Sequence, residues 1–242
     1  MNFTNIRKEK IMKQFERLEL LIGTENLEKL KNMSILVIGL GGVGSYVVES
    51  LIRSGVGTLI LVDYDTIDIT NLNRQLMTNL TNIGKFKTDE LEKRCKTINE
   101  NSHIIKINNF IDENNIDVLF KEKIDYLIDC QDTINTKKLL IKECLNRKIK
   151  FITCMGMGNK LDPSKLEIIE LKKTNYDRIA KILRKWVKEE KINKKIMCCC
   201  SSEKSIKVAG KIIGSTSFVP SSAGLLITSF VINDIIKESN LK

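Results

Sequence analysis

Short apolar runs alternate along this chain with longer stretches in which apolar residues recur at helical spacing. The runs are rich in β-branched residues and mostly apolar, which is typical of strands in a parallel sheet with helices on its faces. The stretches at 88–99 and 136–147 have the length of helices, and such connections predict a parallel sheet with helices on both faces. We expect the strands at 35–38, 59–62, 104–107, 126–128 and 151–153.

A glycine-rich turn follows the first of these strands. It reads Gly39-Leu-Gly41-Gly42-Val-Gly44 and leads into a helical stretch that ends near Ser54. Strand, glycine turn and helix in this order form the start of a dinucleotide-binding fold. The glycines allow a phosphate to approach the backbone N–H groups at the start of the helix. The fold class predicted is therefore α/β, with a Rossmann-like and largely parallel sheet, and the four glycines are candidate nucleotide ligands.

Acidic and cationic residues follow the second strand. Asp63 comes nineteen residues after Gly44, where such folds usually hold ribose hydroxyls. Arg74 and Lys87 are suited to bind a triphosphate and to stabilise negative charge as pyrophosphate departs. A nicotinamide cofactor needs no such chemistry, so the pattern favours ATP. The predicted ATP-binding residues beyond the glycine turn are Asp63, Asp65, Asn71, Arg74, Gln75 and Lys87.

Several of these residues have a purely local alternative. Asp65 could support its own turn, and Asn71 and Asn73 could cap or hydrogen-bond within their segment. Lys85 competes with Lys87 for the phosphate role, and the spacing from the preceding glycine favours Lys87.

The motifs above, together with Asp129-x-x-Asp132, resemble the ubiquitin-activating-enzyme-like superfamily, which includes the ThiF, MoeB and HesA enzymes. The resemblance implies that ATP and Mg²⁺ are used to adenylate a carboxylate. It implies a catalytic role for Arg74, Lys87 and Asp132, with Asp132 as the magnesium ligand. Thr133 stands where many members have asparagine, which leaves the second partner of the magnesium open.

The N-terminal segment carries a further part of the resemblance. Residues 14–23 are similar to the superfamily helix that supplies an arginine to the ATP site of the neighbouring subunit. Arg17 is the candidate for that catalytic role. A homodimer is expected on this ground alone.

Motifs in the second half of the chain resemble one branch of the superfamily, the tRNA threonylcarbamoyladenosine dehydratases. They lie at 129–137, 156–163 and 215–224, and the whole resemblance extends from about residue 10 to about 236. It implies tRNA as the partner and ATP-dependent closure of the threonylcarbamoyl group into a hydantoin ring, through a carboxyl-adenylate. The alternatives are adenylation of the C-terminus of a small sulfur-carrier or ubiquitin-like protein, and a non-catalytic nucleotide sensor. Participation of a sulfur-transfer protein stays open.

The seven cysteines do not form a metal-binding pattern. Four are scattered singly in apolar contexts, which is typical of buried thiols. Cys198-Cys199-Cys200 are adjacent and cannot readily converge on one tetrahedral ion, and no pair of Cys-x-x-Cys clusters is present. We therefore expect no zinc, although many superfamily members carry such a site. A thioester-forming role for one of the three adjacent cysteines is the weaker alternative, and His103 is expected at a strand end rather than as a base.

Positive charge is concentrated in one segment. The formal net charge is +10, and residues 172–211 contain 13 Lys and Arg against four Asp and Glu. This segment includes an amphipathic helix whose cations would either be a solvated face or neutralise tRNA phosphates. The concentration of charge favours RNA. The apolar stripe consists of Ile179, Ile182, Leu183, Trp186 and Val187, and the predicted nucleic-acid-binding residues are Arg178, Lys181, Lys185 and Lys188.

Length and composition predict one adenylating domain over residues 1–242. Within it we expect an N-terminal helical segment (1–33), a nucleotide-binding core (34–171), and a basic helix with a C-terminal sheet and helix extension (172–242). The N-terminus lacks the apolar core of a secretion signal, and the apolar stretch at 223–230 is too short to span a bilayer. A cytoplasmic location without membrane contact is therefore expected.

Overall fold

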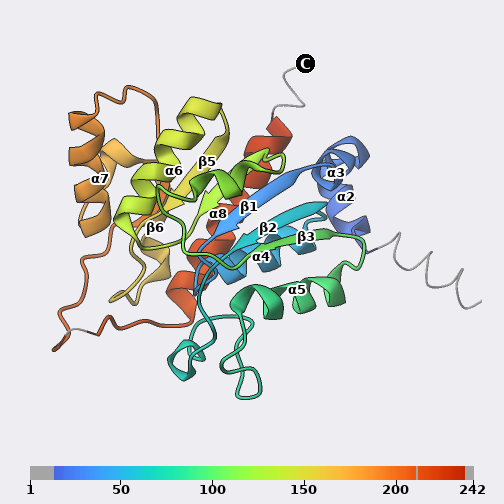
Figure 1. The fold of residues 1–242 in the computed structure, drawn as a ribbon, viewed down its shortest axis with the longest axis horizontal. Coiled ribbons are helices and arrows are strands. Elements are labelled where there is room, and N and C mark those ends of the chain that lie inside the picture. The colour runs from blue at the N-terminus through green and yellow to red at the C-terminus, as the bar shows by residue number, and fades with distance from the viewer. Residues whose placement is uncertain (1–13, 211, 238–242) are drawn as a thin grey trace, which may run out of the picture.

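A seven-stranded sheet forms the centre of the protein, as seen in a computed structural model that describes residues 14–210 and 212–237 (Figure 1). The strand order is β3-β2-β1-β4-β5-β7-β6, and all neighbours are parallel except the β6–β7 pair. The strands are β1 (Ser34–Ile38), β2 (Thr58–Val62), β3 (His103–Ile107), β4 (Tyr126–Asp129), β5 (Lys150–Cys154), β6 (Leu166–Glu170) and β7 (Met197–Ser201). The five predicted strands and the largely parallel sheet are confirmed. A sheet extension was expected within 172–242, but no bounds were predicted for β7, and β6 lies before that region.

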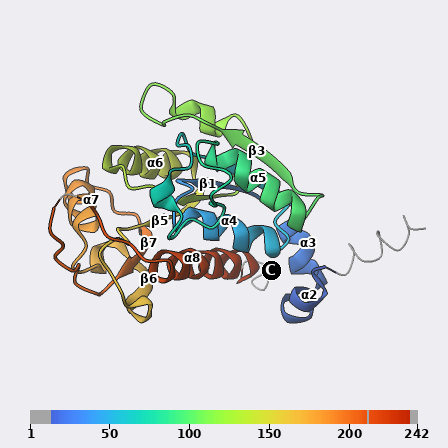
Figure 2. The same ribbon diagram turned by 90° about the horizontal axis from the view of Figure 1, so that it is seen from below.

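Helices cover both faces of this sheet, as predicted. The α-helices are α2 (Glu16–Ile22), α3 (Thr24–Lys31), α4 (Gly44–Arg53), α5 (Lys87–Ile98), α6 (Ile134–Arg147), α7 (Arg178–Glu189) and α8 (Phe218–Lys237). Short 3₁₀ turns lie at Ile69–Asn71, Ile116–Phe120, Pro163–Lys165 and Leu171–Lys173. Figure 2 shows α4 and α8 on one side of the sheet and α6 on the other, with α7 beyond the β5–β7 end. Buried side chains of α4, α5 and α8 share one apolar core, and those of α6 and α7 belong to two further clusters on the opposite face.

The C-terminal helix α8 is longer than the apolar stretch that we expected at 223–230. Its 20 residues are long and apolar enough to cross a membrane by length and composition alone. Its buried face, which includes Ala223, Ile227 and Val231, packs in the same core as α4. At Gly224, a Cβ atom would lie 2.6 Å from the carbonyl oxygen of Val43, so the two helices approach closely there. The apolar composition of α8 is therefore accounted for by packing within the protein.

The strand order places the functional end of the sheet. From β1 the chain continues to β2 and β3 on one side of β1. It then crosses back to β4, which pairs with the other side of β1. In open α/β sheets, the point where the order reverses leaves a crevice beyond the carboxyl ends of the strands. Here that crevice lies between the turn after β1, which contains the glycines, and the turn after β4, which contains Asp132.

Candidate functional site

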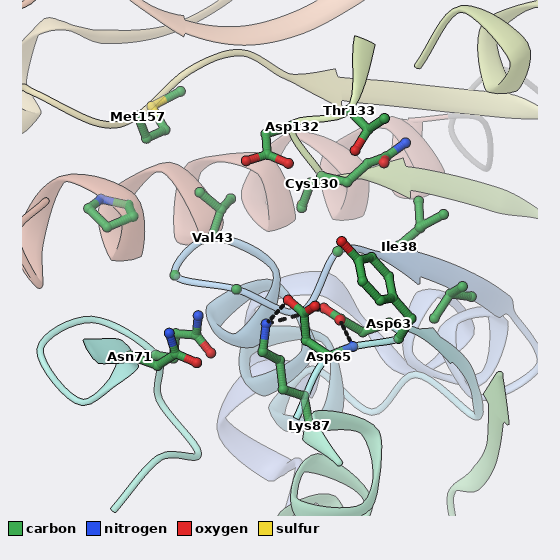
Figure 3. A pocket seen from close by; sticks show the side chains of 18 of the residues that line it. Ile38, Val43, Asp63, Asp65, Asn71, Lys87, Cys130, Asp132, Thr133 and Met157 are labelled. Atoms are coloured by element: carbon green, nitrogen blue, oxygen red, sulfur yellow. Dashed lines mark hydrogen bonds and ion pairs between the residues drawn. The ribbon is translucent and has the colours of Figure 1, made fainter. Parts of the chain in front are cut away.

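A cavity of about 420 Å³ occupies this crevice, a size typical of small-molecule sites. Figure 3 shows the Lys87 ammonium pointing at the carboxylates of Asp63 and Asp65, with Asp132 and Thr133 on the opposite wall. Most of the residues predicted to bind ATP line this one cavity. They are Gly39, Gly41, Gly42, Asp63, Asp65, Asn71, Arg74, Gln75, Lys87 and Asp132.

The glycine turn depends on two positions that cannot hold a side chain. Gly39 has φ +86°, and a Cβ atom there would lie 2.5 Å from the backbone nitrogen of Gln131. A Cβ atom at Gly44 would lie 1.9 Å from the carbonyl oxygen of Gly39. Gly44 does not line the cavity; it begins α4 and lets the turn fold back on itself. The turn thus brings the N-terminus of α4 toward the cavity, where its dipole favours a phosphate.

Asp63 fixes the glycine turn to the end of β2. Its Oδ2 accepts a hydrogen bond from the backbone N–H of Leu40 at 2.6 Å, and its Oδ1 accepts one from Asp65 at 2.8 Å. Burial raises the pKa of Asp63, and the nearby Lys87 ammonium and these two backbone donors partly oppose the rise. A carboxylate held in this way keeps acceptor capacity for ribose hydroxyls.

Lys87 begins α5 and reaches back to the acids after β2. Its Nζ lies 2.6 Å from Oδ2 of Asp65 and 3.9 Å from Oδ2 of Asp63. The Lys87 side chain is 5% exposed, whereas that of Asp65 is 45% exposed. Asp65 therefore does more than support its turn, because it holds the lysine in place. Lys85 is exposed and lies outside the cavity lining, so the geometry favours Lys87, as the spacing did.

The segment after β2 brings an arginine and two amides to the cavity. The Asn71 side chain closes a capping box with Asp68, as its local alternative suggested, and also lines the cavity. Nη1 of Arg74 donates to the carbonyl oxygen of Thr70 at 2.8 Å and to Oδ1 of Asn73 at 2.9 Å. Gln75 is buried, and its Oε1 has no hydrogen-bond partner within the described residues.

Two aspartates, one at the end of β4 and one in the turn after it, lie in different surroundings. Asp129 is buried and accepts hydrogen bonds from Lys137 Nζ at 2.8 Å and Thr153 Oγ1 at 2.6 Å. Lys137 is therefore part of the buried interior and does not line the cavity. Asp132 is exposed at the cavity wall, and no hydrogen bond or ion pair involves its carboxylate in the described part of the chain.

The cavity also contains residues that sequence reasoning missed. Tyr64 and Phe110 form an edge-to-face pair, with ring centroids 5.1 Å apart and an interplanar angle of 82°. Phe110 follows β3 and had no motif to mark it, whereas the position of Tyr64 between two functional aspartates was an available signal. Residues of the second-half motifs also line the cavity, namely Gly156, Met157, Gly158, Ser215 and Pro220.

The other predicted site residues lie outside the cavity. Arg17 is exposed on α2, which lies beside α3 at the amino end of β1, far from the crevice (Figure 1). Arg178, Lys181, Lys185 and Lys188 are exposed on α7, as expected for its polar face, while Leu183, Trp186 and Val187 are buried against α6 and β7. His103 begins β3 at the end of the sheet away from the cavity.

The adjacent cysteines form β7 and are buried. Cys199 faces the core under α8, and Cys198 and Cys200 face the core under α7. A hydrogen bond with Cys154, together with burial, raises the pKa of Cys199, while a hydrogen bond with Cys198 lowers the pKa of Cys200. A buried thiol of raised pKa is a poor nucleophile. Within residues 14–210 and 212–237, no group of three His, Cys, Asp or Glu could hold a metal ion.

Known proteins share this sequence and fold. A model of the ThiF family matches residues 15–218. A tRNA threonylcarbamoyladenosine dehydratase of Bacillus subtilis is 40% identical and covers 96% of this chain and 98% of its own length. One of Haemophilus influenzae is 42% identical over 66% of this chain and 63% of that protein.

Solved structures agree with these relatives. The tRNA N6-threonylcarbamoyladenosine dehydratase of Escherichia coli in complex with ATP has a TM-score of 0.89 and is 27% identical. The match covers 95% of this chain and 96% of that one. The resemblance that the sequence motifs indicated is confirmed: this chain belongs to the ThiF family, and the Bacillus subtilis relative that it matches over nearly the full length of both proteins is a tRNA threonylcarbamoyladenosine dehydratase.

Proposed function

We propose that this protein is an ATP-dependent tRNA threonylcarbamoyladenosine dehydratase, active in the cytoplasm. The observation that carries the proposal is the shared lining of one cavity. The ATP motifs of the first half and the dehydratase-like motifs of the second half, at 156–158 and 215–220, meet there. A nucleotide and a second substrate can therefore be held side by side.

The residues divide the work on ATP as follows. Asp63 holds the ribose, and the glycine turn lies along the phosphates at the N-terminus of α4. Lys87 and Arg74 neutralise the triphosphate and stabilise the departing pyrophosphate. Asp65 keeps Lys87 in position until the ATP phosphates compete for the Lys87 ammonium. They can do so because the Asp65 side chain of this ion pair is 45% exposed.

Asp132 is the residue that would hold Mg²⁺. Protein sites for Mg²⁺ commonly supply one or two carboxylates, and the nucleotide phosphates and water complete the octahedron. A single exposed carboxylate without a protein partner fits this donor set, and the buried Asp129 does not. The ion would neutralise phosphate charge during adenylation.

The bonds that form and break belong to the two substrates, ATP and the modified nucleoside. One carboxylate oxygen of the threonylcarbamoyl group attacks the α-phosphate, the bond to pyrophosphate breaks, and an acyl-adenylate forms. A nitrogen of the same group then attacks the activated carbonyl and loses its proton, and AMP departs with that oxygen. The nucleoside loses the elements of water and gains a five-membered hydantoin ring. Intramolecular attack in a held geometry has an effective molarity on the order of 10⁵ M or more, so no cysteine nucleophile is required.

Arg17 is proposed to act on the partner's nucleotide in a homodimer. It is exposed on α2, away from the cavity of its own chain, and Leu20 and Leu21 of the same helix are 82% and 85% exposed. Exposed apolar residues beside an exposed arginine are what a helix docking on a second subunit would present. A sulfur-transfer protein as an additional partner has no comparable support in the described residues.

The cationic face of α7 is proposed to bind tRNA phosphates. Replacing Lys181, Lys185 and Lys188 with glutamine should weaken tRNA binding. A plot of the logarithm of the association constant against the logarithm of the salt concentration should become less steep by about 2 to 3, because each lost phosphate contact removes about 0.9 from the magnitude of the slope. Lys31, Lys93 and Lys123, exposed on other surfaces, provide a control triple variant with the same loss of charge. Equal slopes for both triple variants would leave α7 as a solvated face.

One experiment tests the main proposal. The protein is incubated with ATP, Mg²⁺ and tRNA carrying the open threonylcarbamoyl group, and the nucleosides are then weighed. We expect loss of one water together with AMP release, and the Arg74→Ala variant should lose AMP formation while still binding tRNA. An unchanged nucleoside mass, with pyrophosphate exchange stimulated by a carrier protein's C-terminus, would instead support adenylation of a carrier protein.

A further inference from the structure

Tyr176 is the most exposed aromatic side chain in the described residues, at 60%. Its backbone is left-handed, with φ 57°, which costs a bulky residue about 1 kcal/mol or more. Such a conformation persists only where the neighbouring residues determine it. The segment therefore holds an exposed ring in a defined place at a cost in stability.

The residues around Tyr176 explain how the ring is held. Asp177 caps α7 by accepting the N–H of Ala180 at 2.7 Å, and its other oxygen accepts the N–H of Gly156 at 3.1 Å. On the other side, Arg184 donates to the carbonyl oxygen of Thr174 at 2.8 Å. The chain is therefore anchored two residues before and one residue after the ring.

Tyr176 does not itself line the cavity, but this anchoring places it next to residues that do, at what we call the rim. Gly156, which Asp177 binds directly, lines the cavity, and so does Ile179 in the first turn of α7. Nζ of Lys204 lies 5.3 Å from the centroid of the Tyr176 ring. Lys204 belongs to the connection between β7 and α8, which contributes Ile213 and Ser215 to the cavity lining. Two segments of the rim thus meet at this ring.

An exposed ring beside a cation has the chemistry of a platform for an unpaired base. Stacking of a base on an aromatic side chain contributes about 1–3 kcal/mol, and a neighbouring cation attracts the adjoining phosphate. Tyr64 and Phe110 differ because they lie inside the cavity and pack on each other. Tyr176 has a lysine near its ring, and the cationic face of α7 begins two residues later at Arg178.

We propose that Tyr176 and Lys204 form a stacking platform for the RNA base next to the nucleoside that enters the cavity. The inference rests on the proposed tRNA substrate and names a part of its recognition. A nucleoside that enters an enzyme pocket leaves the stack of its neighbours. Tyr176 replaces the lost stacking for the neighbouring base, while Lys204 contacts the phosphate between the two.

Kinetics with tRNA carrying threonylcarbamoyladenosine test the platform. Tyr176→Ala should raise the KM for tRNA by about 5- to 150-fold, which corresponds to the stacking energy, and leave the KM for ATP unchanged. Tyr176→Phe keeps the aromatic ring, so its KM for tRNA should stay within about twofold of the wild-type value. A tRNA KM that Tyr176→Ala leaves unchanged, or an equal rise in the KM for ATP, would overturn the proposal.

A second measurement does not depend on turnover. An RNA stem-loop with 2-aminopurine next to the target adenosine should lose fluorescence when its base stacks on Tyr176. The quenching should persist in Tyr176→Phe and disappear in Tyr176→Ala; quenching that is absent in the wild type, or equal in Tyr176→Ala, contradicts the platform. Failure of the wild type to dehydrate tRNA would refute the proposed reaction, and the quenching would still decide the platform.

Discussion

Two aspartate–lysine pairs lie at the carboxyl ends of β2 and β4, the strands that flank β1, and they differ in their exposure to solvent. Lys87 and Asp65, after β2, are 2.6 Å apart at the cavity wall, and the aspartate side chain is 45% exposed. Asp129, the last residue of β4, and Lys137 of α6 are 2.8 Å apart with side chains 2% and 0% exposed. The same pair of residue types thus forms an accessible site in one region and a sealed support in the other.

The partners of each lysine explain the difference. Lys137 Nζ also donates to Thr153 Oγ1 and to the carbonyl oxygen of Cys154, so the ammonium is satisfied by groups that no ligand can displace. Asp129 in turn accepts the N–H of Gln131 at 3.3 Å, in the turn that leads to Asp132. Among residues 14–210 and 212–237, the Lys87 ammonium pairs with only the two acids after β2, and an ATP phosphate can compete for it. Exposure of the pair to solvent, more than its charge, therefore distinguishes a lysine that a ligand can reach from a lysine that supports the fold.

The largest effect is expected at the sealed pair. Lys137→Met should lower the free energy of unfolding by about 3–5 kcal/mol, because it leaves Asp129 buried without a counter-charge. Urea unfolding followed by circular dichroism measures the loss. Adding Asp129→Asn should recover part of it by removing that charge. A loss no larger than that of Lys87→Met would remove the distinction between the two pairs.

Lys87→Met should act on the reaction more than on stability. We expect AMP formation to slow by about 10²- to 10³-fold, the usual effect of losing one preorganised group that stabilises transition-state charge. The free energy of unfolding should fall by less than in Lys137→Met, since the Asp65 side chain, which lies 2.6 Å from Lys87, is 45% exposed and stays in contact with water. Rapid-quench assays with labelled ATP give the rate, and normal AMP formation would disprove the phosphate role.

The pH dependence of nucleotide binding gives the smallest and most specific test. Burial raises the pKa of Asp63, so its carboxylate protonates at a higher pH than an ordinary aspartate as the pH falls. As the pH is lowered, the affinity for a non-hydrolysable ATP analogue should therefore begin to decline at a pH above the range in which an ordinary aspartate is protonated. Lys87→Met should move the decline to still higher pH, because the ammonium opposes the rise, and Lys137→Met should not move it. Calorimetric titrations measure the affinity, and Asp63→Asn should remove this component.

Local sequence was sufficient for the parts of the fold whose signals lie within a few residues. Apolar runs predicted β1 to β5 within about one residue. Strands buried on both faces, such as β1, β2 and β4, admit little else, whereas the edge strand β3 is only partly buried. Local sequence missed the bounds of β6, Leu-Glu-Ile-Ile-Glu, and β7, Met-Cys-Cys-Cys-Ser. Their antiparallel pairing at the sheet edge depends on a long connection through α7, which no local pattern encodes.

For the site, the sequence by itself determined the chemistry: a glycine turn, acids at strand ends, and the cations Arg74 and Lys87. Only the tertiary structure decided which residues share the cavity and what each is paired with. It brought Tyr64 to Phe110, sealed Lys137 against Asp129, and set Tyr176 on the rim. The physical reason is that residue type follows from the sequence, whereas burial and partner follow from how distant helices and strands pack.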